Sequence, residues 1–314
     1  MATAKTLGVV AMKTQYRRSL FLVAIAVFFL FLSSCLVYLL LRRPFALRVI
    51  ACAVGQGDGL LFSYGHQHIL LDSGRNSAIM RCLQRNISFL DPVIEMVILT
   101  HGDADHIGGF ESVTAHYHVE QLLTNPLEKK SDVAEFVRLY AQEHPQTIFA
   151  EMPGSSILAP GWRGRLVWSE AYRSAYWNEA SIPSDENGGS VSFTFQLQSF
   201  GFLSLGDLEC SAELAVASLP LLNKTDFLKI SHHGSKFSSC LDFLAKVRPE
   251  IGIISVGKGN SYGHPGENVL ENLENEGITA YRTDYEGDLI WWLGPNKQLK
   301  REICAQNDHR CRND

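Results

Sequence analysis

The feature that most constrains this chain is a run of six residues, His101-Gly102-Asp103-Ala104-Asp105-His106, which follows a short segment rich in Val and Ile. That segment, from Val93 to Leu99, is typical of a buried strand. In an extended chain, residues two apart point to the same side, so His101 and Asp103 can reach one metal ion together. A helix that begins near His106 turns Asp105 and His106 towards a second ion. The spacing therefore predicts a two-metal site.

Two later segments offer further ligands at the ends of apolar stretches. Asp207 follows Phe202-Leu203-Ser204-Leu205-Gly206, so its carboxylate is expected at the end of a strand, where it could bridge two cations. The segment Lys229-Ile230-Ser231-His232-His233-Gly234-Ser235 runs from a short strand into a polar turn with two histidines. Either segment alone is weak evidence. Together with the first cluster they predict one rim of metal-binding side chains.

The chain after Pro44 is expected to form one α/β domain whose strands and helices segregate into layers. The expected strands are 47–54, 60–64, 68–71, 93–99, 147–168, 190–205, 226–230, 250–255, 279–282 and 288–293. The expected helices are 76–86, 131–144, 209–217, 239–247 and 266–276. Residues 169–189 are expected to be an irregular loop, either a lid or an ordinary packed loop. The predicted division is a tail over 1–18, a transmembrane helix over 19–43, a folded domain over 44–295 and a polar tail over 296–314.

The segment from Leu20 to Leu41 carries no charge and is long enough to span a hydrocarbon core of roughly 30 Å. A buried core helix is the less favoured interpretation, because the run is apolar on every face. A cleaved lipoprotein signal ending at Cys35 is another, although the apolar run continues beyond that residue. The basic residues on the two sides barely differ in number. A short tail before a signal anchor favours a single-pass protein whose domain lies outside the cytoplasm.

Composition limits the partners, the disulfides and the thiolate metal sites that this chain can have. A formal net charge of −5 over 314 residues argues against coating by nucleic acid through bulk charge, so recognition of phosphate must be local. The 7 cysteines include no Cys-x-x-Cys pair, and the sequence suggests neither a thiolate zinc site nor a disulfide scaffold. Cys304 and Cys311 are close enough to bridge in an oxidising compartment.

Six blocks of sequence, taken together, resemble the metallo-β-lactamase domain of the ComEC family, the competence proteins of DNA uptake. The blocks are Val54–Asp58, Leu70–Gly74, Thr100–Gly109, Gly206–Glu209, Ser231–Ser235 and Asn260–Pro265. The resemblance covers about residues 47–293 in order, without the polytopic channel of the full-length competence proteins. It implies a stand-alone form of the domain, an αββα sandwich preceded by a single transmembrane helix, with two divalent metal ions.

The resemblance also implies roles for the metal-binding residues. His101 and Asp103 would hold one ion, Asp105, His106 and His233 the other, and Asp207 would bridge them. His232 would support the ligands, although the two adjacent histidines could be exchanged. The family pattern has a histidine where Asp103 stands, and no histidine between His144 and Asp207 supplies the middle ligand of the first ion. That ion would be held loosely, or through Asn187 and water. The added carboxylate makes Mn²⁺ a competitor of Zn²⁺.

Other residues of these blocks are expected to orient ligands or to contact substrate. Asp58 and Asp72 are expected to orient the histidines, with turn formation as an equal alternative, and Ala53 replaces an aspartate of the family. His264 is expected to contact a phosphate or to protonate the leaving group, unless it is a plain turn residue. The remaining candidates at the site are Lys236, Ser235 and Asn260, with Lys258 adding positive potential.

The leading function is a metal-dependent phosphodiesterase acting on DNA, with Asp105, His264 and Lys236 as the catalytic residues. Hydrolysis of a smaller phosphoester, such as a phosphocholine or a nucleotide, is the enzymatic alternative, because this fold hosts many chemistries. A domain that binds DNA or a membrane partner without catalysis is the third interpretation, in which the first metal site is vestigial.

Overall fold

The computed structural model divides the chain into two units, Met1–Phe45 and Ala46–Asp314. It describes residues 2–41, 47–159, 162–177, 187–197, 200–222, 225–294 and 299–304.

The first unit is a single helix, α1 (Ala2–Leu41). Its part from Arg18 to Val37 has a mean hydropathy of 2.9, and none of this stretch is buried. It is long and apolar enough to cross a membrane. The expected tail over residues 1–18 is helical from Ala2 on, so the helix extends well beyond the predicted span.

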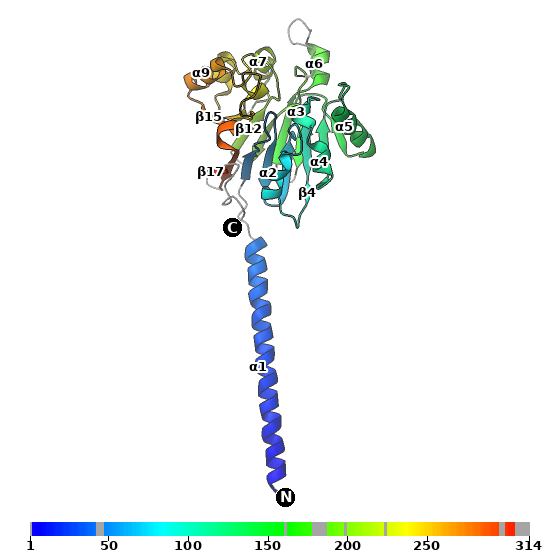
Figure 1. Ribbon diagram of the computed structural model, residues 1–314, viewed down its shortest axis with the longest axis vertical. Coiled ribbons are helices and arrows are strands. Elements are labelled where there is room, and N and C mark those ends of the chain that lie inside the picture. Colours follow the sequence, from blue (N-terminus) through cyan, green and yellow to red (C-terminus); the bar gives the residue numbers. More distant parts are fainter. Residues whose placement is uncertain are drawn as a thin grey trace. The chain divides into compact units, whose positions relative to one another are not determined.

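The second unit is built from two sheets packed face to face, with helices on both outer faces (Figure 1). One sheet has the order β17-β16-β1-β2-β3-β5-β7-β8 and the other β15-β14-β13-β12-β11-β10-β9. The strands of the first are β1 (Leu47–Ala51), β2 (Leu60–Tyr64), β3 (Gln67–Leu71), β5 (Met96–Leu99), β7 (Leu122–Thr124), β8 (Thr147–Phe149), β16 (Asp288–Leu293) and β17 (Leu299–Cys304). The strands of the second are β9 (Ser156–Ala159), β10 (Trp162–Trp168), β11 (Ser192–Leu197), β12 (Phe200–Ser204), β13 (Phe227–Lys229), β14 (Ile251–Ile254) and β15 (Thr279–Arg282).

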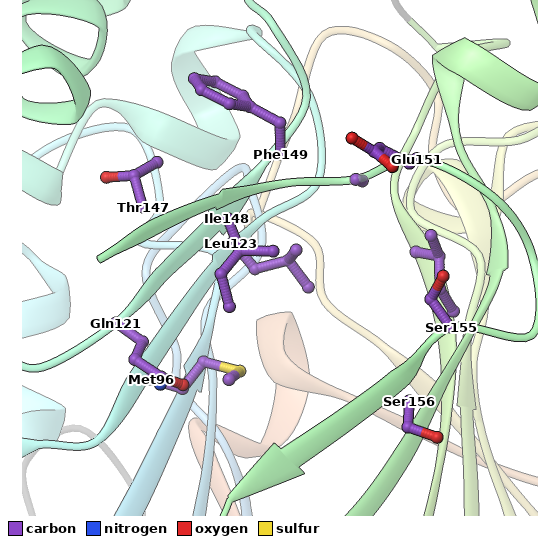
Figure 2. A pocket seen from close by; sticks show the side chains of 11 residues that line it. Met96, Gln121, Leu123, Thr147, Ile148, Phe149, Glu151, Ser155 and Ser156 are labelled. Carbon is purple, nitrogen blue, oxygen red and sulfur yellow. The ribbon is translucent and has the colours of Figure 1, made fainter. Parts of the chain in front are cut away.

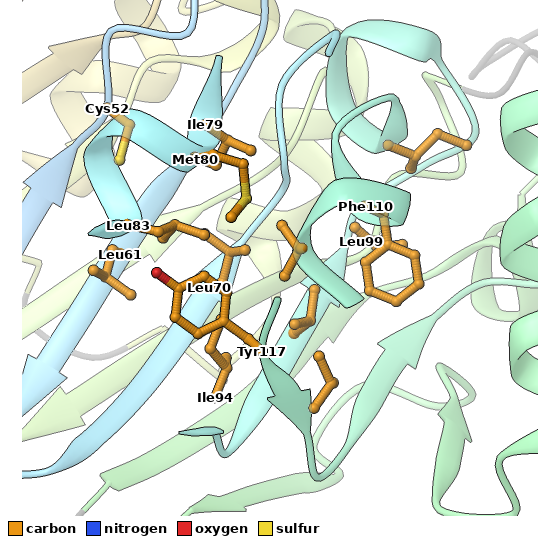
Figure 3. Close-up of a cluster of buried hydrophobic side chains, with 14 of the residues drawn as sticks. Cys52, Leu61, Leu70, Ile79, Met80, Leu83, Ile94, Leu99, Phe110 and Tyr117 are labelled. Carbon is orange, nitrogen blue, oxygen red and sulfur yellow. The ribbon is translucent and has the colours of Figure 1, made fainter. Parts of the chain in front are cut away.

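Three buried clusters hold the four layers together. The first lies between the sheets, where Phe62 packs edge to face on Phe202, and Phe227 packs in the same way on Trp291. The second lies under α2 (Ile79–Asn86), α4 (Phe110–Thr114) and α5 (Asp132–Glu143), as Figure 3 shows for Met80, Leu83 and Phe110. The third lies under α7 (Cys210–Ser218), α8 (Leu241–Val247) and α9 (Glu267–Asn275). The expected αββα sandwich is thus confirmed.

Parallel pairing determines where the functional loops lie. The pairs β3–β5 and β5–β7 are parallel in one sheet, and β12–β13 and β13–β14 are parallel in the other. The carboxyl ends of parallel neighbours meet at one edge of a sheet. The loops that follow β3, β5, β12, β13 and β14 therefore gather at one end of the sandwich, and these loops carry the residues that the sequence singled out.

Three differences from the sequence-based expectations concern the periphery. Residues 169–189 were expected to be irregular, but α6 (Glu170–Tyr176) forms there, because the Ser169 hydroxyl caps it by accepting a hydrogen bond from Tyr172 N at 3.2 Å. The part of this segment over 178–186 lies outside the described residues. The expected polar tail over 296–314 contains β17, which pairs antiparallel with β16. Residues 93–99 form two strands, β4 (Val93–Ile94) and β5, and β4 pairs with β6 (His118–Val119) in a separate small sheet.

Two disulfides correct the expectation that this domain has no disulfide framework. Cys52 bonds to Cys82, and Cys210 bonds to Cys240, each across a sequence separation of 30 residues. Such pairs carry no local signature, because the fold rather than the spacing brings the sulfur atoms together. The predicted Cys304–Cys311 bridge lies outside the described residues. Cys35, in α1, is a free cysteine.

A cavity of about 580 Å³ lies where the edge strands of the two sheets face each other, between β8 and the β9–β10 pair (Figure 2). Its walls include Met96, Leu123, Phe149 and Leu166. None of its lining residues belongs to the metal-binding set that the sequence predicts, so it is separate from the candidate centre described next.

Candidate metal centre

The histidine-aspartate run lies at the end of a strand that is buried on both faces. All four residues of β5 are buried, and four residues separate its end from the start of α3 (Ala104–Ile107). Asp103 has extended backbone angles and its carbonyl accepts a hydrogen bond from His106 N at 2.9 Å. The change from extended to helical backbone therefore falls between Asp103 and Asp105, as the sequence predicts.

His106 is fully buried and is held through both ring nitrogens. Its Nδ1 lies 2.9 Å from Asp72 Oδ2, and its Nε2 lies 3.2 Å from Asp207 Oδ2. Asp72 also accepts hydrogen bonds from the Thr100 backbone N at 2.8 Å and from its hydroxyl at 2.9 Å. A carboxylate that accepts a hydrogen bond from Nδ1–H keeps the proton on that nitrogen, so the Nε2 lone pair is free for a metal ion. Asp72 thus makes the orienting contact that the sequence suggested.

His233 approaches the same point from the opposite sheet. Its Nδ1 donates to the Ser255 carbonyl at 2.9 Å, which again leaves Nε2 as the free acceptor. His233 Nε2 lies 3.3 Å from His106 Nε2 and 3.4 Å from both Asp207 Oδ2 and Asp105 Oδ2. Two imidazoles and two carboxylates therefore converge, and a cation could contact all four.

His101 and Asp103 lie on the other side of Asp207. His101 Nε2 is 3.8 Å from Asp103 Oδ2 and 4.0 Å from Asp207 Oδ2. This nitrogen is buried and has no hydrogen-bond partner, while Nδ1 lies 3.0 Å from the Thr100 hydroxyl. A buried acceptor facing two carboxylates is explained by a cation between them. The donor set, imidazole and carboxylate without sulfur, suits Zn²⁺ or Mn²⁺.

The segment around Asn187 was expected to complete the metal position of His101 and Asp103, and it places Ser190 there. Asn187 accepts a hydrogen bond from Ser190 N through its backbone oxygen at 3.0 Å. The Ser190 hydroxyl lies 3.5 Å from His101 Nδ1 and accepts a hydrogen bond from Asp207 N at 3.2 Å. Lys129, on the loop after β7, donates to Asp103 Oδ1. Ser190 and Lys129 were both missed in the sequence, because their loops are distant from every motif.

Lys229 is the most important residue that the sequence analysis did not assign. It is fully buried, it pairs with Asp58 Oδ2, and its Nζ lies 3.2 Å from Asp207 Oδ1 and 3.0 Å from the Gly206 carbonyl oxygen. Burial alone raises the pKa of Asp58, but the charges of Lys229 and His233 outweigh it and hold that pKa at about 2. The sequence did carry a signal for this residue, since a lysine stands within an apolar strand three residues before two histidines.

Asp58 faces the Nδ1 atoms of both buried histidines, the side on which an orienting carboxylate is expected. Its side chain lies 3.5 Å from His233 Nδ1 and 3.6 Å from His106 Nδ1. Potential ligand atoms of Asp58, His106, Asp207 and His233 all lie within 4.8 Å of one another, which makes Asp58 a further residue able to hold an ion. Lys229 pairs with Asp58 as well as with Asp207, so a buried cation already faces both carboxylates of this set.

The two adjacent histidines adopt an unusual backbone. His232 and His233 have φ values of 51° and 55°, in the left-handed region that non-glycine residues seldom occupy. Strain of this kind persists where a function requires it. It separates the two rings, because His233 points to the convergent atoms whereas His232 Nε2 lies 4.0 Å from Asp207 Oδ2. The Ser235 backbone closes the turn, donating to the His232 carbonyl at 2.8 Å.

His264 lies beside His232, with ring centroids 5.6 Å apart. Asn260 fixes it from both sides, accepting from His264 N at 3.1 Å and donating to its carbonyl at 2.7 Å. Burial, together with the charges of His232 and His233, lowers the pKa of His264 to about 4. The Lys236 ammonium lies 5.0 Å from the centroid of the Phe237 ring.

The electrostatics of the centre favour positive charge where the ring nitrogens converge. Burial alone lowers the pKa values of His106 and His233, but Asp207 and the other carboxylates raise that of His106 well above its usual value and that of His233 to about 9. Burial raises the pKa of Asp207, yet His106, His233 and Lys229 hold it well below its usual value. A divalent cation at this point would meet the same field.

Comparison with known proteins agrees with this arrangement. The metallo-beta-lactamase superfamily matches residues 53–258. ComE operon protein 3 of Bacillus subtilis (strain 168) is 30% identical over 254 residues, which are 75% of this chain and 32% of that protein. Competence protein ComA of Neisseria gonorrhoeae is 27% identical over 242 residues, 76% of this chain and 31% of that protein. The chain thus spans about a third of the length of these relatives.

A solved structure shows the same fold. The metallo-beta-lactamase fold protein YhfI from Bacillus subtilis has a TM-score of 0.53 at 12% identity, covering 79% of this chain and 99% of that one. The predicted resemblance to the competence proteins is confirmed by the relatives, and the fold by this structure. With its fold, its converging histidines and carboxylates, and the match over most of the second unit, this chain belongs to the metallo-β-lactamase superfamily.

Proposed function

We propose that the chain is a metal-dependent phosphodiesterase that cleaves DNA at a two-metal centre. The convergence of His106 Nε2, His233 Nε2 and Asp207 Oδ2 within 3.4 Å of one another carries this proposal. Asp105 completes the position, and Asp207 is shared with the neighbouring position of His101 and Asp103. These ligands are the ones that the sequence predicts.

Divalent ions held there would polarise a water molecule and lower its pKa from ~15.7 towards ~7. In the hydrolysis, the water gives up a proton as its oxygen bonds to phosphorus, the bond from phosphorus to the leaving alcohol oxygen breaks, and that oxygen takes up a proton in its place. The carboxylates of Asp103, Asp105 and Asp207 only partly balance two divalent charges. The centre then has net positive charge, which favours an anionic ester as substrate.

His264 and two lysines extend this preference to the rim of the centre. Because its pKa is low, His264 is neutral near pH 7 and donates a hydrogen bond to a substrate oxygen rather than a proton. Lys129 pairs with Asp103, and Lys236 lies over the Phe237 ring, so both would add positive charge for a phosphate. These local charges provide the attraction that a net charge of −5 does not.

The relatives support DNA as the substrate, because the matched protein of Neisseria gonorrhoeae is named a competence protein. The membrane helix α1 and the two disulfides support a domain outside the cytoplasm, since disulfides persist in oxidising compartments. A domain in that position would meet DNA before it enters the cytoplasm.

A smaller phosphoester is the second candidate substrate, because the acidic net charge gives the chain no extended attraction for a polymer. The third interpretation, binding without catalysis, requires that the metal position of His101 and Asp103 be vestigial. Both of these residues are nevertheless present, 3.8 Å apart.

The test uses the full chain in detergent, with metal removed and Mn²⁺ or Zn²⁺ restored. Labelled single- and double-stranded DNA and a simple phosphodiester are offered to the protein and to its Asp105→Asn variant, with Asp132→Asn as the matched control at an exposed carboxylate of α5. We expect the wild-type chain to cut DNA only when metal is present, and Asp105→Asn to cut it at least about 100-fold more slowly. Hydrolysis of the simple diester alone would favour the smaller substrate, and no hydrolysis with metal bound would favour the non-catalytic interpretation.

A further inference from the structure

The rim of the metal centre carries aromatic rings that metal binding does not require. Tyr262 is 60% exposed, and its ring stacks on that of His264 with centroids 5.8 Å apart and planes 17° apart. His264 in turn contacts the His232 ring, and His232 Nε2 lies 4.0 Å from Asp207 Oδ2. A continuous series of ring contacts therefore leads from solvent to the carboxylate at the middle of the centre.

A second exposed ring stands on the neighbouring loop. Phe237 is 57% exposed, and the Lys236 ammonium lies 5.0 Å from its centroid. The loops that carry Phe237 and Tyr262 pack on each other, because Gly266 N donates to the Gly234 carbonyl at 2.8 Å. A Cβ atom on Gly266 would lie 3.1 Å from Lys236 Cβ, so the two loops approach closely. We call Lys236, Phe237, Tyr262 and His264 the aromatic rim.

Tyr262 is held in place although its ring faces water. Asn260 Oδ1 accepts hydrogen bonds from the backbone N atoms of Tyr262 and His264, both at 3.1 Å. Asn260 Nδ2 donates to the Gly257 carbonyl at 3.1 Å. The half-buried Asn260 amide thus organises the backbone of the turn, and the Tyr262 ring stacks on His264 beside the centre.

We infer that the aromatic rim is a stacking platform for an unpaired nucleobase beside the phosphodiester that is cut, an inference that rests on the proposed function. Stacking of a base on an aromatic side chain tolerates any sequence, because every base has a π face. A base inside a duplex is already stacked and paired, so the platform selects single strands or frayed ends. Lys236, over Phe237, supplies a cation for the neighbouring phosphate.

The experiment compares two single-stranded oligonucleotides of equal length and charge, one with bases and one with abasic residues around the labelled diester. Cleavage by the metal-loaded full chain in detergent gives kcat and KM for each. Binding is measured separately by fluorescence anisotropy in the Asp105→Asn background, where cutting does not interfere. The variants are Tyr262→Ala, Tyr262→Leu and Tyr262→Phe, and Phe89→Ala is the control at a ring that is 88% exposed on a distant turn.

The expected preference of the wild-type chain for the oligonucleotide with bases is about 10- to 100-fold, the range that stacking of a base provides. Tyr262→Ala and Tyr262→Leu should reduce this ratio mainly through KM, whereas Tyr262→Phe and Phe89→Ala should retain it. Equal cleavage of both oligonucleotides by the wild-type chain would overturn the aromatic rim and leave the proposed function standing. If neither is cut, the proposed function fails, and the anisotropy ratio alone then decides whether the rim binds bases.

Discussion

At the level of single residues, Lys229 provides a permanent positive charge beneath the metal centre. Its contacts with Asp58, Asp207 and the Gly206 carbonyl leave none of its donors towards solvent, and its burial is complete. The pairing explains how two aspartates can be buried beside each other without a cost that would unfold the domain. It also turns Asp207 so that Oδ2, and not Oδ1, faces the histidines.

Lys229→Met is therefore expected to destabilise the domain by about 3–5 kcal/mol, because it leaves Asp58 buried without its counter-charge. The double variant Lys229→Met with Asp58→Asn should recover a large part of that loss, since both charges are then gone. Chemical unfolding of the full chain in detergent measures both free energies. A double variant no more stable than the single one would show that the ion pair is not the reason for the loss.

Glu213 makes stability depend on pH from a position outside the ligand set. It is fully buried and accepts a hydrogen bond from Ser239 N at 2.6 Å, and burial raises its pKa to about 7. The folded protein thus binds a proton that the unfolded chain releases near pH 4.5. The resulting stability is complete below about pH 4.5 and is lost as the pH rises through about 7.

Glu213→Gln should remove this dependence. Relative to the wild-type chain, the variant is expected to gain up to about 3 kcal/mol on going from pH 5 to pH 8, the equivalent of the shift in pKa. Unfolding at a series of pH values gives the comparison. Parallel curves for the two proteins over that interval would mean that Glu213 does not titrate there.

At the level of elements, the strand ends account for what the sequence could predict. β3, β5, β12 and β13 each run into a polar turn, and parallel pairing brings those turns together. His101, His106, Asp207 and His233 were identifiable for this reason. Lys129, Ser190 and the role of Lys229 were not, because these contacts depend on how the two sheets face each other. The capped helix α6 and the edge strand β17 lie in polar segments whose local pattern is weak.

Each of the two disulfides joins a loop near the centre to a helix. Cys52 lies at the end of β1, just before the turn that carries Asp58, and its partner Cys82 lies in α2. Cys210 begins α7, and its partner Cys240 precedes α8, shortly after the two histidines. Closing loops of this length stabilises a fold by about 3–4 kcal/mol in the chain-entropy view.

Alkylation of the unreduced, denatured chain should accordingly leave Cys52, Cys82, Cys210 and Cys240 unmodified. Peptide mass spectrometry should find them joined as two pairs, and prior reduction should make all four reactive. Reactivity of all four without reduction, in protein purified from its native membrane, would contradict the pairing and with it the oxidising location.

At the level of the whole molecule, the chain joins a helix that is long and apolar enough to cross a membrane to a metallo-β-lactamase domain. If the domain lies outside the cytoplasm, protease added to sealed cells should digest it while a cytoplasmic control protein stays intact. Rupture of the cells should then expose the control. Protection of the domain until rupture would place it on the cytoplasmic side, and the disulfides would then need another explanation.

The most direct test of the account is the amount of metal that the full chain retains. After metal removal, equilibrium dialysis against Mn²⁺ or Zn²⁺ and elemental analysis should find two ions for each wild-type chain and for Asp132→Asn. Asp207→Asn should lose at least one of them, because that carboxylate lies 3.2 Å from His106 Nε2 and 4.0 Å from His101 Nε2. A wild-type chain that retains no ion, or an Asp207→Asn variant that keeps both, would contradict the metal centre described here.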